Sequence, residues 1–376
     1  MKMDEKSLLP SGLCDTLFPQ AQIELEAGNV LLSTFKSFGY NLVNPPLMEF
    51  EETLLSGQEG VTGEDTFRVM DPSSHRMMGV RSDMTAQISR LASTKLSENE
   101  RPLRLMYGGD VLRVTGSIMR PDRGFKQYGV ELIGVDSAMA DAEVILLSLE
   151  GLKNAGVKNI SVDINIPLLP KLSAESVGID FADVAFAFEK RDVSAMEKLG
   201  GRASEVLSAV LKCTGRAENV IKTFQDIDLN TEAKALIERV GAVVTILKSR
   251  LDADTMVTID ACEVCGFSFQ TGIGFTLFCA DARGELGRGG RYLLKGTGES
   301  CVGFSLYLDS LKTVLPTMAV QAKIYAPYDT DYAVIKKLRN AGTAVVCALR
   351  HDEDARISAK EKKCTGILIN NNIETF

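Results

Sequence analysis

The sequence FKQYGVELIGV, residues 125 to 135, places polar groups in a segment that otherwise suits a buried strand. Alternate side chains of a strand point to opposite faces, so Gln127 and Glu131 share one face, with Gly129 between them. The other face is mostly apolar and suits a core. A buried carboxylate is costly unless a partner compensates its charge. We therefore expect Glu131 to meet either a protein cation or a bound ligand.

Arg113 could be the cation that pairs with Glu131. It lies near the end of the strand expected at residues 103 to 112, which we expect to pair antiparallel with the strand that contains Glu131. Two interpretations stay open. Arg113 and Glu131 could form an internal ion pair with a structural role alone. Alternatively, they could line a pocket for a zwitterion, in which carboxylates bind an ammonium group and the guanidinium binds a carboxylate.

A second polar cluster, GVRSDMTAQ, lies where a strand is expected to meet a helix. Asp83 is a good candidate for the residue that caps this helix, which would leave Thr85 as an ordinary first-turn residue. The functional alternative is that Asp83 and Thr85 offer a carboxylate and a hydroxyl group to an amine.

The Cys262-x-x-Cys265 pair raises the question of a metal site. A zinc site needs four ligands, usually as two close pairs, and the chain has only two histidines, His75 and His351, neither beside a cysteine. We predict no metal site and expect reduced thiols. The glycine-rich GELGRGGRY lacks the Lys-Ser/Thr of a phosphate-binding loop, and we interpret it as a tight hairpin.

The composition is that of a globular protein of 376 residues, with 45% hydrophobic and 24% charged residues. Its net charge of −8 argues mildly against a chain built to hold a nucleic acid backbone. The first residues lack the apolar segment of a signal peptide, and no stretch is apolar for long enough to span a bilayer. We expect a soluble cytoplasmic protein with no membrane contact.

Hydrophobic periodicity predicts the elements that carry these residues. We expect a helix over residues 19 to 38, a hairpin around Asp71-Pro72, an apolar helix at VGFSLYLDSLKTVL, and a small α/β unit from about 322 to the end. From about 167 to 252 the chain is rich in Ala, Leu, Glu and Lys and has few strand signals, so we expect a helical insertion there. His75 is expected to be a solvated residue of the hairpin turn.

The segments YGGDVLRV and RGFKQYGVELIG resemble motif 2 of the class II aminoacyl-tRNA synthetases, in the histidyl version. NPPLMEF is similar to their motif 1, CVGFSLYLDSL to their motif 3, and GRGGRY to a histidyl-specific segment. The resemblance covers roughly residues 7 to 315. It implies an α+β fold with an antiparallel sheet flanked by helices. The implied core spans 1–320 with the insertion at 167–252, and 321–376 resembles a shortened anticodon-binding unit.

Two departures from the synthetase pattern bear on catalysis. Cys265 stands where those enzymes have an arginine against the substrate, and Asp309-Ser310 replace the Glu-Arg pair of motif 3. Adenylate formation needs cations where negative charge develops, and each lost donor costs about 10²–10³ in rate. Arg113 remains, with Arg120, Arg123 and Lys126 near the motif 2 loop. We therefore predict no catalytic residues and no cofactor, with weak nucleotide binding left open.

The amino-acid pocket of the synthetases, by contrast, is matched. The resemblance implies that Asp83, Thr85 and Gln127 hold an α-ammonium group, Arg113 the carboxylate side and Glu131 an imidazole. Phe269 and Gln270 stand where the synthetases carry two tyrosines, so their roles at the ring are altered.

A retained ligand pocket without the activating cations resembles the regulatory subunits of ATP phosphoribosyltransferase, the first enzyme of histidine biosynthesis. This resemblance implies a non-catalytic histidine-binding subunit, dimeric through its core, in a hetero-oligomer with a short catalytic subunit. No tRNA binding is expected, because residues 321–376 hold nine basic and seven acidic side chains. The alternatives are a divergent histidyl-tRNA synthetase, or a histidine-binding module with another client.

Overall fold

The structure is a computed structural model that describes residues 8–56, 66–263, 270–316 and 322–376. The chain divides into two compact units, Met1–Pro316 and Thr317–Phe376, and each is described by itself. None of the described helices is long and apolar enough to cross a membrane.

The first unit contains most of the elements. Its helices are α1 (Gln20–Ser37), α2 (Glu51–Ser56), α3 (Thr85–Ser93), α4 (Ala138–Asn154), α5 (Leu169–Ser176), α6 (Phe181–Glu189), α7 (Val193–Glu197), α8 (Gly201–Leu211), α9 (Ala217–Phe224), α10 (Thr231–Arg250) and α11 (Leu308–Leu311). Its strands are β1 (Asn41–Leu42), β2 (Met48–Phe50), β3 (Arg68–Met70), β4 (Met77–Val80), β5 (Leu103–Leu112), β6 (Gly124–Ile133), β7 (Ile160–Asn165), β8 (Thr214–Arg216), β9 (Met256–Asp260), β10 (Gln270–Cys279), β11 (Gly287–Leu293) and β12 (Ser300–Tyr307).

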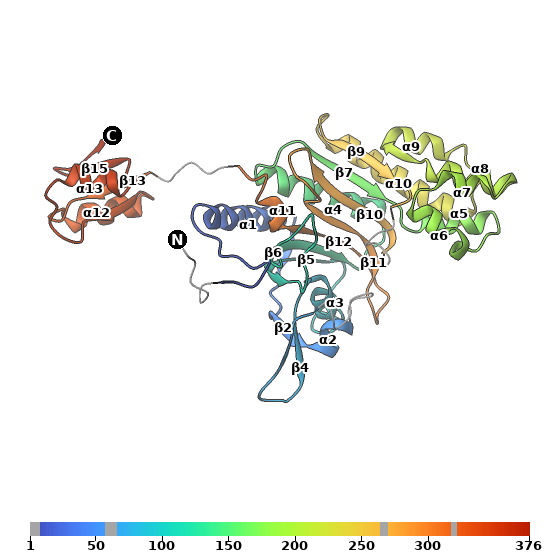
Figure 1. Cartoon of the computed structure of the whole chain (residues 1–376), viewed down its shortest axis with the longest axis horizontal. Helices are drawn as coiled ribbons and strands as arrows, with labels where there is room; N and C mark the ends of the chain where they lie inside the picture. Colours follow the sequence, from blue (N-terminus) through green and yellow to red (C-terminus); the bar gives the residue numbers. More distant parts are fainter. Residues whose placement is uncertain (1–7, 57–65, 264–269, 317–321) are drawn as a thin grey trace. The chain divides into compact units, whose positions relative to one another are not determined.

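The central sheet, as far as the structure describes it, has nine strands in the order β1-β5-β6-β12-β11-β10-β7-β9-β8. The pairs from β5 through to β7 are antiparallel, and β1 with β5 and β7 with β9 are parallel. Because helices also cover this sheet (Figure 1), the predicted α+β class with a synthetase-like antiparallel sheet is confirmed.

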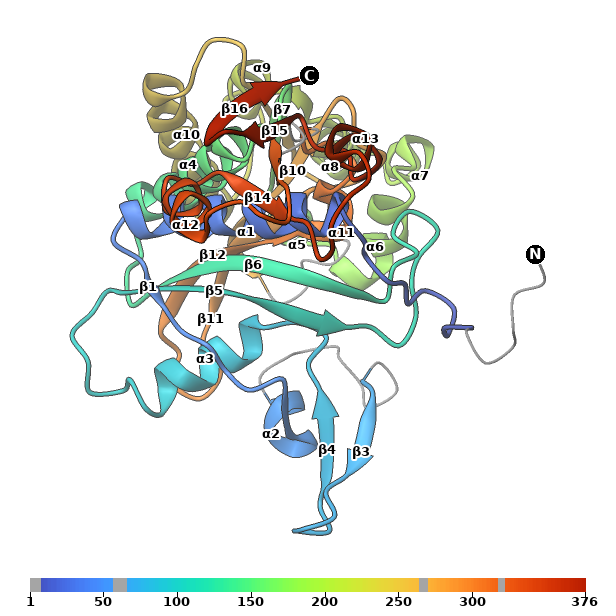
Figure 2. The same cartoon turned by 90° about the vertical axis from the view of Figure 1, so that its left-hand side faces the viewer.

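The alternation of β6 sets the two faces of this sheet. Tyr128, Val130 and Leu132 point into the large core with Leu31 and Phe35 of α1 and with α4. The opposite face of the sheet packs against α3 (Figure 2) in a smaller cluster that includes Met84, Ile88, Tyr107, Tyr292 and Cys301. The apolar face predicted for this strand is confirmed, and its polar residues lie on the α3 side.

A separate three-stranded sheet, in the order β2-β4-β3, contains the predicted hairpin. The Asp71 carboxylate accepts hydrogen bonds from the backbone N–H groups of Ser73 and Ser74, which closes the turn. His75 is exposed with a φ of 55°, as expected for a turn residue.

The stretch expected to be helical, residues 167 to 252, contains α5 to α10 and the short strand β8. Side chains of Asp180, Asp192 and Asn230 cap α6, α7 and α10 by accepting from backbone N–H groups. Local sequence therefore specifies where these helices begin, and their apolar faces extend the large core.

Two sequence predictions near the motif 3 segment are wrong. VGFSLYLDSLKTVL is not one apolar helix, because residues 300–307 form β12 in the middle of the sheet and only Leu308–Leu311 are helical. GELGRGGRY is not a tight hairpin, because GRGGRY lies within β11, which pairs antiparallel with β10. A short apolar run that is buried on both faces has no periodicity that separates helix from strand, so partners elsewhere in the chain decide.

The second unit is a small α/β unit. Its elements are β13 (Lys323–Ala326), α12 (Tyr332–Asn340), β14 (Ala344–Cys347), α13 (Ala355–Glu361), β15 (Gly366–Ile369) and β16 (Asn372–Thr375). The sheet order is β14-β13-β15-β16, with an antiparallel last strand. Strand and helix alternate as the sequence predicts, and β16 is an addition.

Candidate functional site

The polar face of β6 lies in the middle of the sheet, between β5 and β12. Gln127 stands opposite Tyr307 and Glu131 opposite Gly303 in β12. Both polar side chains are buried, at 1% and 2% exposure. Each must therefore find its hydrogen-bond partners inside the protein or on a ligand.

Gln127 connects β6 to the start of α3. Its Oε1 accepts a hydrogen bond from the Met84 backbone N–H at 2.9 Å, and its Nε2 donates to Asp83 Oδ2 at 2.7 Å. The same nitrogen donates to Ser305 Oγ in β12 at 2.7 Å. Gln127 thereby holds the Asp83 carboxylate against the sheet.

Asp83 supports the start of α3, although the capping residue of this helix is Met84 and not Asp83 as predicted. Its Oδ1 accepts a hydrogen bond from the Thr85 backbone N–H at 2.7 Å, which stabilises the first turn of α3. Its other oxygen is bound by Gln127. The Thr85 hydroxyl lies 3.4 Å from the Tyr107 hydroxyl, so Thr85 belongs to the same polar group.

Glu131 is held by uncharged donors. Tyr292 OH donates to its Oε2 at 3.0 Å, Cys301 Sγ donates to the same oxygen at 3.3 Å, and Tyr107 OH lies 3.5 Å from its Oε1. Burial raises the pKa of Glu131 to about 8. The negative charge of Asp83 also raises this pKa, whereas the three hydrogen bonds lower it. Near neutral pH, the Glu131 carboxyl group is therefore protonated, and a cation bound beside it would favour its ionisation.

The internal ion pair between Arg113 and Glu131, one of the two interpretations left open by the sequence, does not form. In the register of the sheet, Glu131 stands opposite Leu105, seven residues or roughly 24 Å along β5 from Leu112. The Arg113 guanidinium instead lies over the rings of Phe125 and Tyr307, 4.5 and 5.5 Å from their centroids. Burial lowers the pKa of Arg113, and Arg120 lowers it further.

Several members of this polar group were missed by the sequence analysis, namely Tyr107, Ser305, Tyr292, Cys301 and Ser89. The Ser305 hydroxyl lies 3.1 Å from that of Tyr107 and joins the Gln127 and Glu131 sides of the group. Alternation along β12 gives a signal for two of them, because Cys301 and Ser305 share a face with Gly303 between them.

Gly303 makes the room that Glu131 occupies. A Cβ atom at this position would lie 2.0 Å from Glu131 Oε2 and 2.4 Å from the Val130 carbonyl oxygen. The backbone cannot yield there, because β12 pairs with β6 on that side.

The substitution Gly303→Ala is therefore expected to destabilise the fold by about 1–3 kcal/mol through overpacking. Urea denaturation measures the change. Gly272→Ala is the matched control, since the nearest atom to its added carbon, on the Arg291 side chain, would lie 3.2 Å away instead of 2.0 Å. Equal effects of the two substitutions would contradict the assigned role of Gly303.

Gln270 lies on the same face, opposite Tyr292 in the neighbouring strand, and is 5% exposed. Its Nε2 donates to the Gly289 carbonyl at 3.1 Å, and its buried Oε1 has no hydrogen-bond partner among the described residues. This oxygen is available to a donor on a ligand. Phe269 and Cys265, also singled out by the sequence, lie outside the described residues.

The cations near the motif 2 loop are engaged within the protein. Arg120 forms two hydrogen bonds with the buried Asp309 carboxylate, at 3.0 and 2.9 Å, and its guanidinium stacks 4.0 Å from the Tyr307 ring. Lys126 pairs with Asp110 at 2.8 Å, and Arg123 donates to the Ser11 carbonyl at 2.9 Å. Asp309 thus neutralises a cation that a polyphosphate would need.

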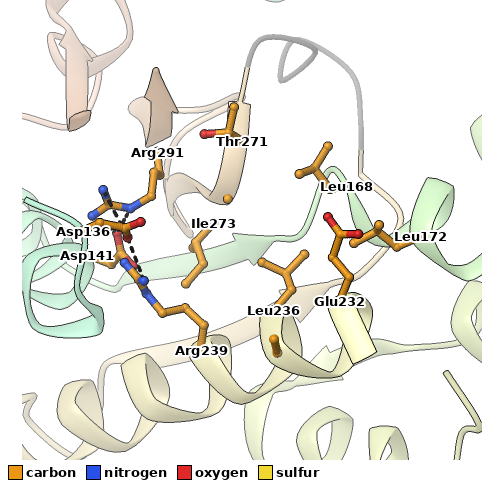
Figure 3. A pocket seen from close by; sticks show the side chains of 12 residues that line it. Asp136, Asp141, Leu168, Leu172, Glu232, Leu236, Arg239, Thr271, Ile273 and Arg291 are labelled. Carbon is orange, nitrogen blue, oxygen red and sulfur yellow. Dashed lines mark hydrogen bonds and ion pairs between the residues drawn. The ribbon is translucent and has the colours of Figure 1, made fainter. Parts of the chain in front are cut away.

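A separate cavity of about 220 Å³ lies on the opposite face of the sheet, between the core and the helical insertion (Figure 3). At one end, Arg239 of α10 and Arg291 of β11 both bind the buried Asp141 carboxylate, each at 2.8 Å through Nε. Asp136 also contacts Arg239, at 2.8 Å. Two guanidinium groups thus balance two carboxylates, and we assign this cluster to holding α10 against the core.

Cys262 does not have the character of a metal ligand. Its thiol is buried, lies 3.4 Å from the Val210 carbonyl oxygen, and burial raises its pKa well above the ordinary value. No group of three or more potential metal ligands occurs among the residues that the structure describes.

Comparison with known proteins gives one consistent family. A model of the histidyl-tRNA synthetase family matches residues 12–311. ATP phosphoribosyltransferase regulatory subunits of Rhodospirillum rubrum and Rhodospirillum centenum are 42% and 40% identical, over 98% and 95% of this chain and 96% and 93% of theirs.

Solved structures agree with the sequence relatives. A structure from Bacillus halodurans, described as an ATP phosphoribosyltransferase regulatory subunit/histidyl-tRNA synthetase, has a TM-score of 0.80 at 26% identity, covering 96% of this chain and 97% of that one. Histidyl-tRNA synthetase from Nostoc, at 18% identity and a TM-score of 0.76 over 96% of this chain and 91% of that one, shares the fold. The chain departs from the synthetase motifs, and its relatives at 40–42% identity over nearly the full length are regulatory subunits. It therefore belongs to the family of ATP phosphoribosyltransferase regulatory subunits.

Proposed function

We propose that this chain is the non-catalytic regulatory subunit of ATP phosphoribosyltransferase in the first step of L-histidine biosynthesis. In this proposal it activates the short catalytic subunit and binds histidine for feedback control. The observation that carries the proposal is a contrast between two groups of polar residues. The polar group around Gln127 and Glu131 is intact, whereas Arg120 is bound to Asp309.

The polar group suits histidine because it offers complementary charge at separate points. Glu131 is surrounded by donors without charge, so a protonated imidazole would supply the cation that the buried carboxylate lacks. Asp83, Thr85 and Gln127 would hold the α-ammonium group. Arg113, whose guanidinium lies beside the ring of Tyr307 opposite Gln127, would hold the carboxylate side. Gln270, with its unused oxygen, and Phe269 would contact the ring region.

Feedback requires that histidine bind one state of the assembly more tightly than the other. The proposed assembly is a homodimer through the synthetase-like core, within a hetero-oligomer that contains the catalytic subunit. We propose that this assembly works in the cytoplasm and binds no tRNA. The regulatory subunits among its relatives carry a name that presupposes such a partner.

Mixing the purified chain with the short catalytic subunit tests the proposal directly. We expect no phosphoribosyltransferase activity from this chain alone, a higher rate for the mixture than for the catalytic subunit alone, and inhibition of the mixture by histidine. Failure to associate, or an unchanged rate, would refute the proposed function.

The alternative of a divergent histidyl-tRNA synthetase is tested by ATP–pyrophosphate exchange with histidine. We expect exchange at background level, because each missing electrostatic donor costs about 10²–10³ in rate. Rapid exchange would favour the enzyme. Asp309→Ala serves as a companion variant, because it releases Arg120 from its carboxylate partner. If exchange does not recover in this variant, the cations missing at Cys265 and Ser310 also matter.

A further inference from the structure

A groove of about 530 Å³ lies in the helical insertion, away from the site described above. One wall is formed by α10, where Lys234, Ile237, Glu238 and Gly241 follow the spacing that places residues on one helix face. The other wall is α9 and the segment after it. Ile221, Phe224, Ile227 and Ile237 supply an apolar lining. Lys234 and Gly241 are seven residues apart, about 10 Å along the helix.

The groove is also lined by a glycine, Gly241, that the protein's own packing does not require. It lies in the middle of a 20-residue helix, where glycine is about 1 kcal/mol less favourable than alanine. A Cβ atom at Gly241 would meet nothing within 4 Å in the described protein, so no internal contact calls for a glycine. Gly303 in β12 shows the opposite case, because an added Cβ there would lie 2.0 Å from Glu131 Oε2. A side chain at 241 would fill the groove instead.

The rim of the groove is acidic. Lys234 and Arg202 both contact the Asp228 carboxylate, at 3.9 and 2.8 Å, so that acid is compensated. Asp226 and Glu238 line the groove, and neither has an ion-pair partner within the described part of the chain. An occupant therefore needs apolar side chains for the floor and at least one basic side chain for the rim.

We propose that this groove is a docking site for the catalytic subunit, which would insert an apolar, lysine- or arginine-flanked segment at Gly241. The inference rests on the proposed function for the existence of that partner. The two walls are helices with an apolar floor between them, which is the arrangement that accepts an amphipathic helix from a second protein. The groove lies on α9 and α10, whereas the histidine site lies on the α3 face of the sheet.

Filling the groove tests the proposal. Gly241→Leu is expected to weaken binding of the purified catalytic subunit at least tenfold in titration calorimetry, while histidine affinity and helix content stay at the wild-type level. The matched control is Ala242→Leu, which adds the same side chain one residue further on, at an exposed position. It should leave the affinity unchanged. The pair Asp226→Asn and Glu238→Gln should also weaken binding and reduce its dependence on salt.

The outcomes separate this inference from the proposed function. If the wild-type chain does not bind the catalytic subunit, the proposed function fails. If the wild-type chain binds and Gly241→Leu binds equally well, only the docking site is refuted. Sedimentation of Gly241→Leu without the partner gives the remaining outcome. A change in its oligomeric state would show that a second copy of this chain occupies the groove, which overturns the assignment to the catalytic subunit.

Discussion

Replacing Glu131 with glutamine is expected to weaken histidine binding about 10- to 150-fold, the equivalent of one hydrogen bond to a charged group at 1.5–3 kcal/mol. The amide cannot ionise, so it cannot compensate a protonated imidazole. Feedback inhibition of the assembled enzyme should be lost over the histidine range that inhibits the wild type. Binding and activation of the catalytic subunit should persist. Titration calorimetry of histidine, with and without the catalytic subunit, measures the effect.

Glutamine is the sharper substitution because it keeps the volume of the side chain. Alanine would leave the hydroxyl groups of Tyr107 and Tyr292 and the Cys301 thiol without their acceptor, in a cavity, so that binding and stability would change together. Glu205→Gln, at an exposed position of α8, is the matched control and should bind histidine normally. Unchanged histidine affinity in Glu131→Gln would remove Glu131 from the site.

The second large effect is on the pH dependence of stability. Glu131 keeps its proton in the folded chain up to about pH 8, whereas the unfolded chain loses it near 4.5. Between these values the folded state binds more protons, so the free energy of unfolding falls as the pH rises. Below pH 4.5 and above pH 8, Glu131 does not change how the free energy of unfolding depends on pH. Over this window the wild type should lose about 2–5 kcal/mol relative to Glu131→Gln.

Urea denaturation of both proteins at pH 5, 6, 7 and 8 provides the measurement. Glu131→Gln removes the titrating group while it keeps the shape, so groups elsewhere in the chain contribute equally to the two curves. The difference between the two free energies of unfolding should shrink or change sign toward pH 5 and level off above pH 8. Parallel curves across the whole range would mean that Glu131 is ionised in the folded state.

The ion pair between Arg120 and Asp309 engages one of the cations that remain near the motif 2 loop. A buried guanidinium that already binds a carboxylate through two hydrogen bonds can turn to a phosphate only if that carboxylate is left unpaired, which is costly. The sequence indicates that Asp309-Ser310 replace the glutamate-arginine pair of motif 3, so that Ser310 supplies no cation. The structure adds that Asp309 forms an ion pair with Arg120, one of the cations that remain.

Local pattern was sufficient for several parts of this protein. The alternation of FKQYGVELIGV predicted which side chains of β6 enter the core and that Gln127 and Glu131 are buried together. Turn residues predicted the hairpin at Asp71, and a composition rich in Ala, Leu, Glu and Lys predicted the helical character of residues 167 to 252. These features depend on residues close in sequence, because a turn, a cap or an alternating face is formed by neighbours.

The tertiary structure alone decided what surrounds Glu131. Its donors come from β5, β11 and β12, which lie far apart in the sequence and meet only through the order and register of the sheet. The same register separated Arg113 from Glu131 and made residues 300–307 a strand instead of a helix. The sequence by itself determined that a carboxylate would be buried at 131. Which groups stabilise that carboxylate depends on pairing between distant strands, which no local pattern encodes.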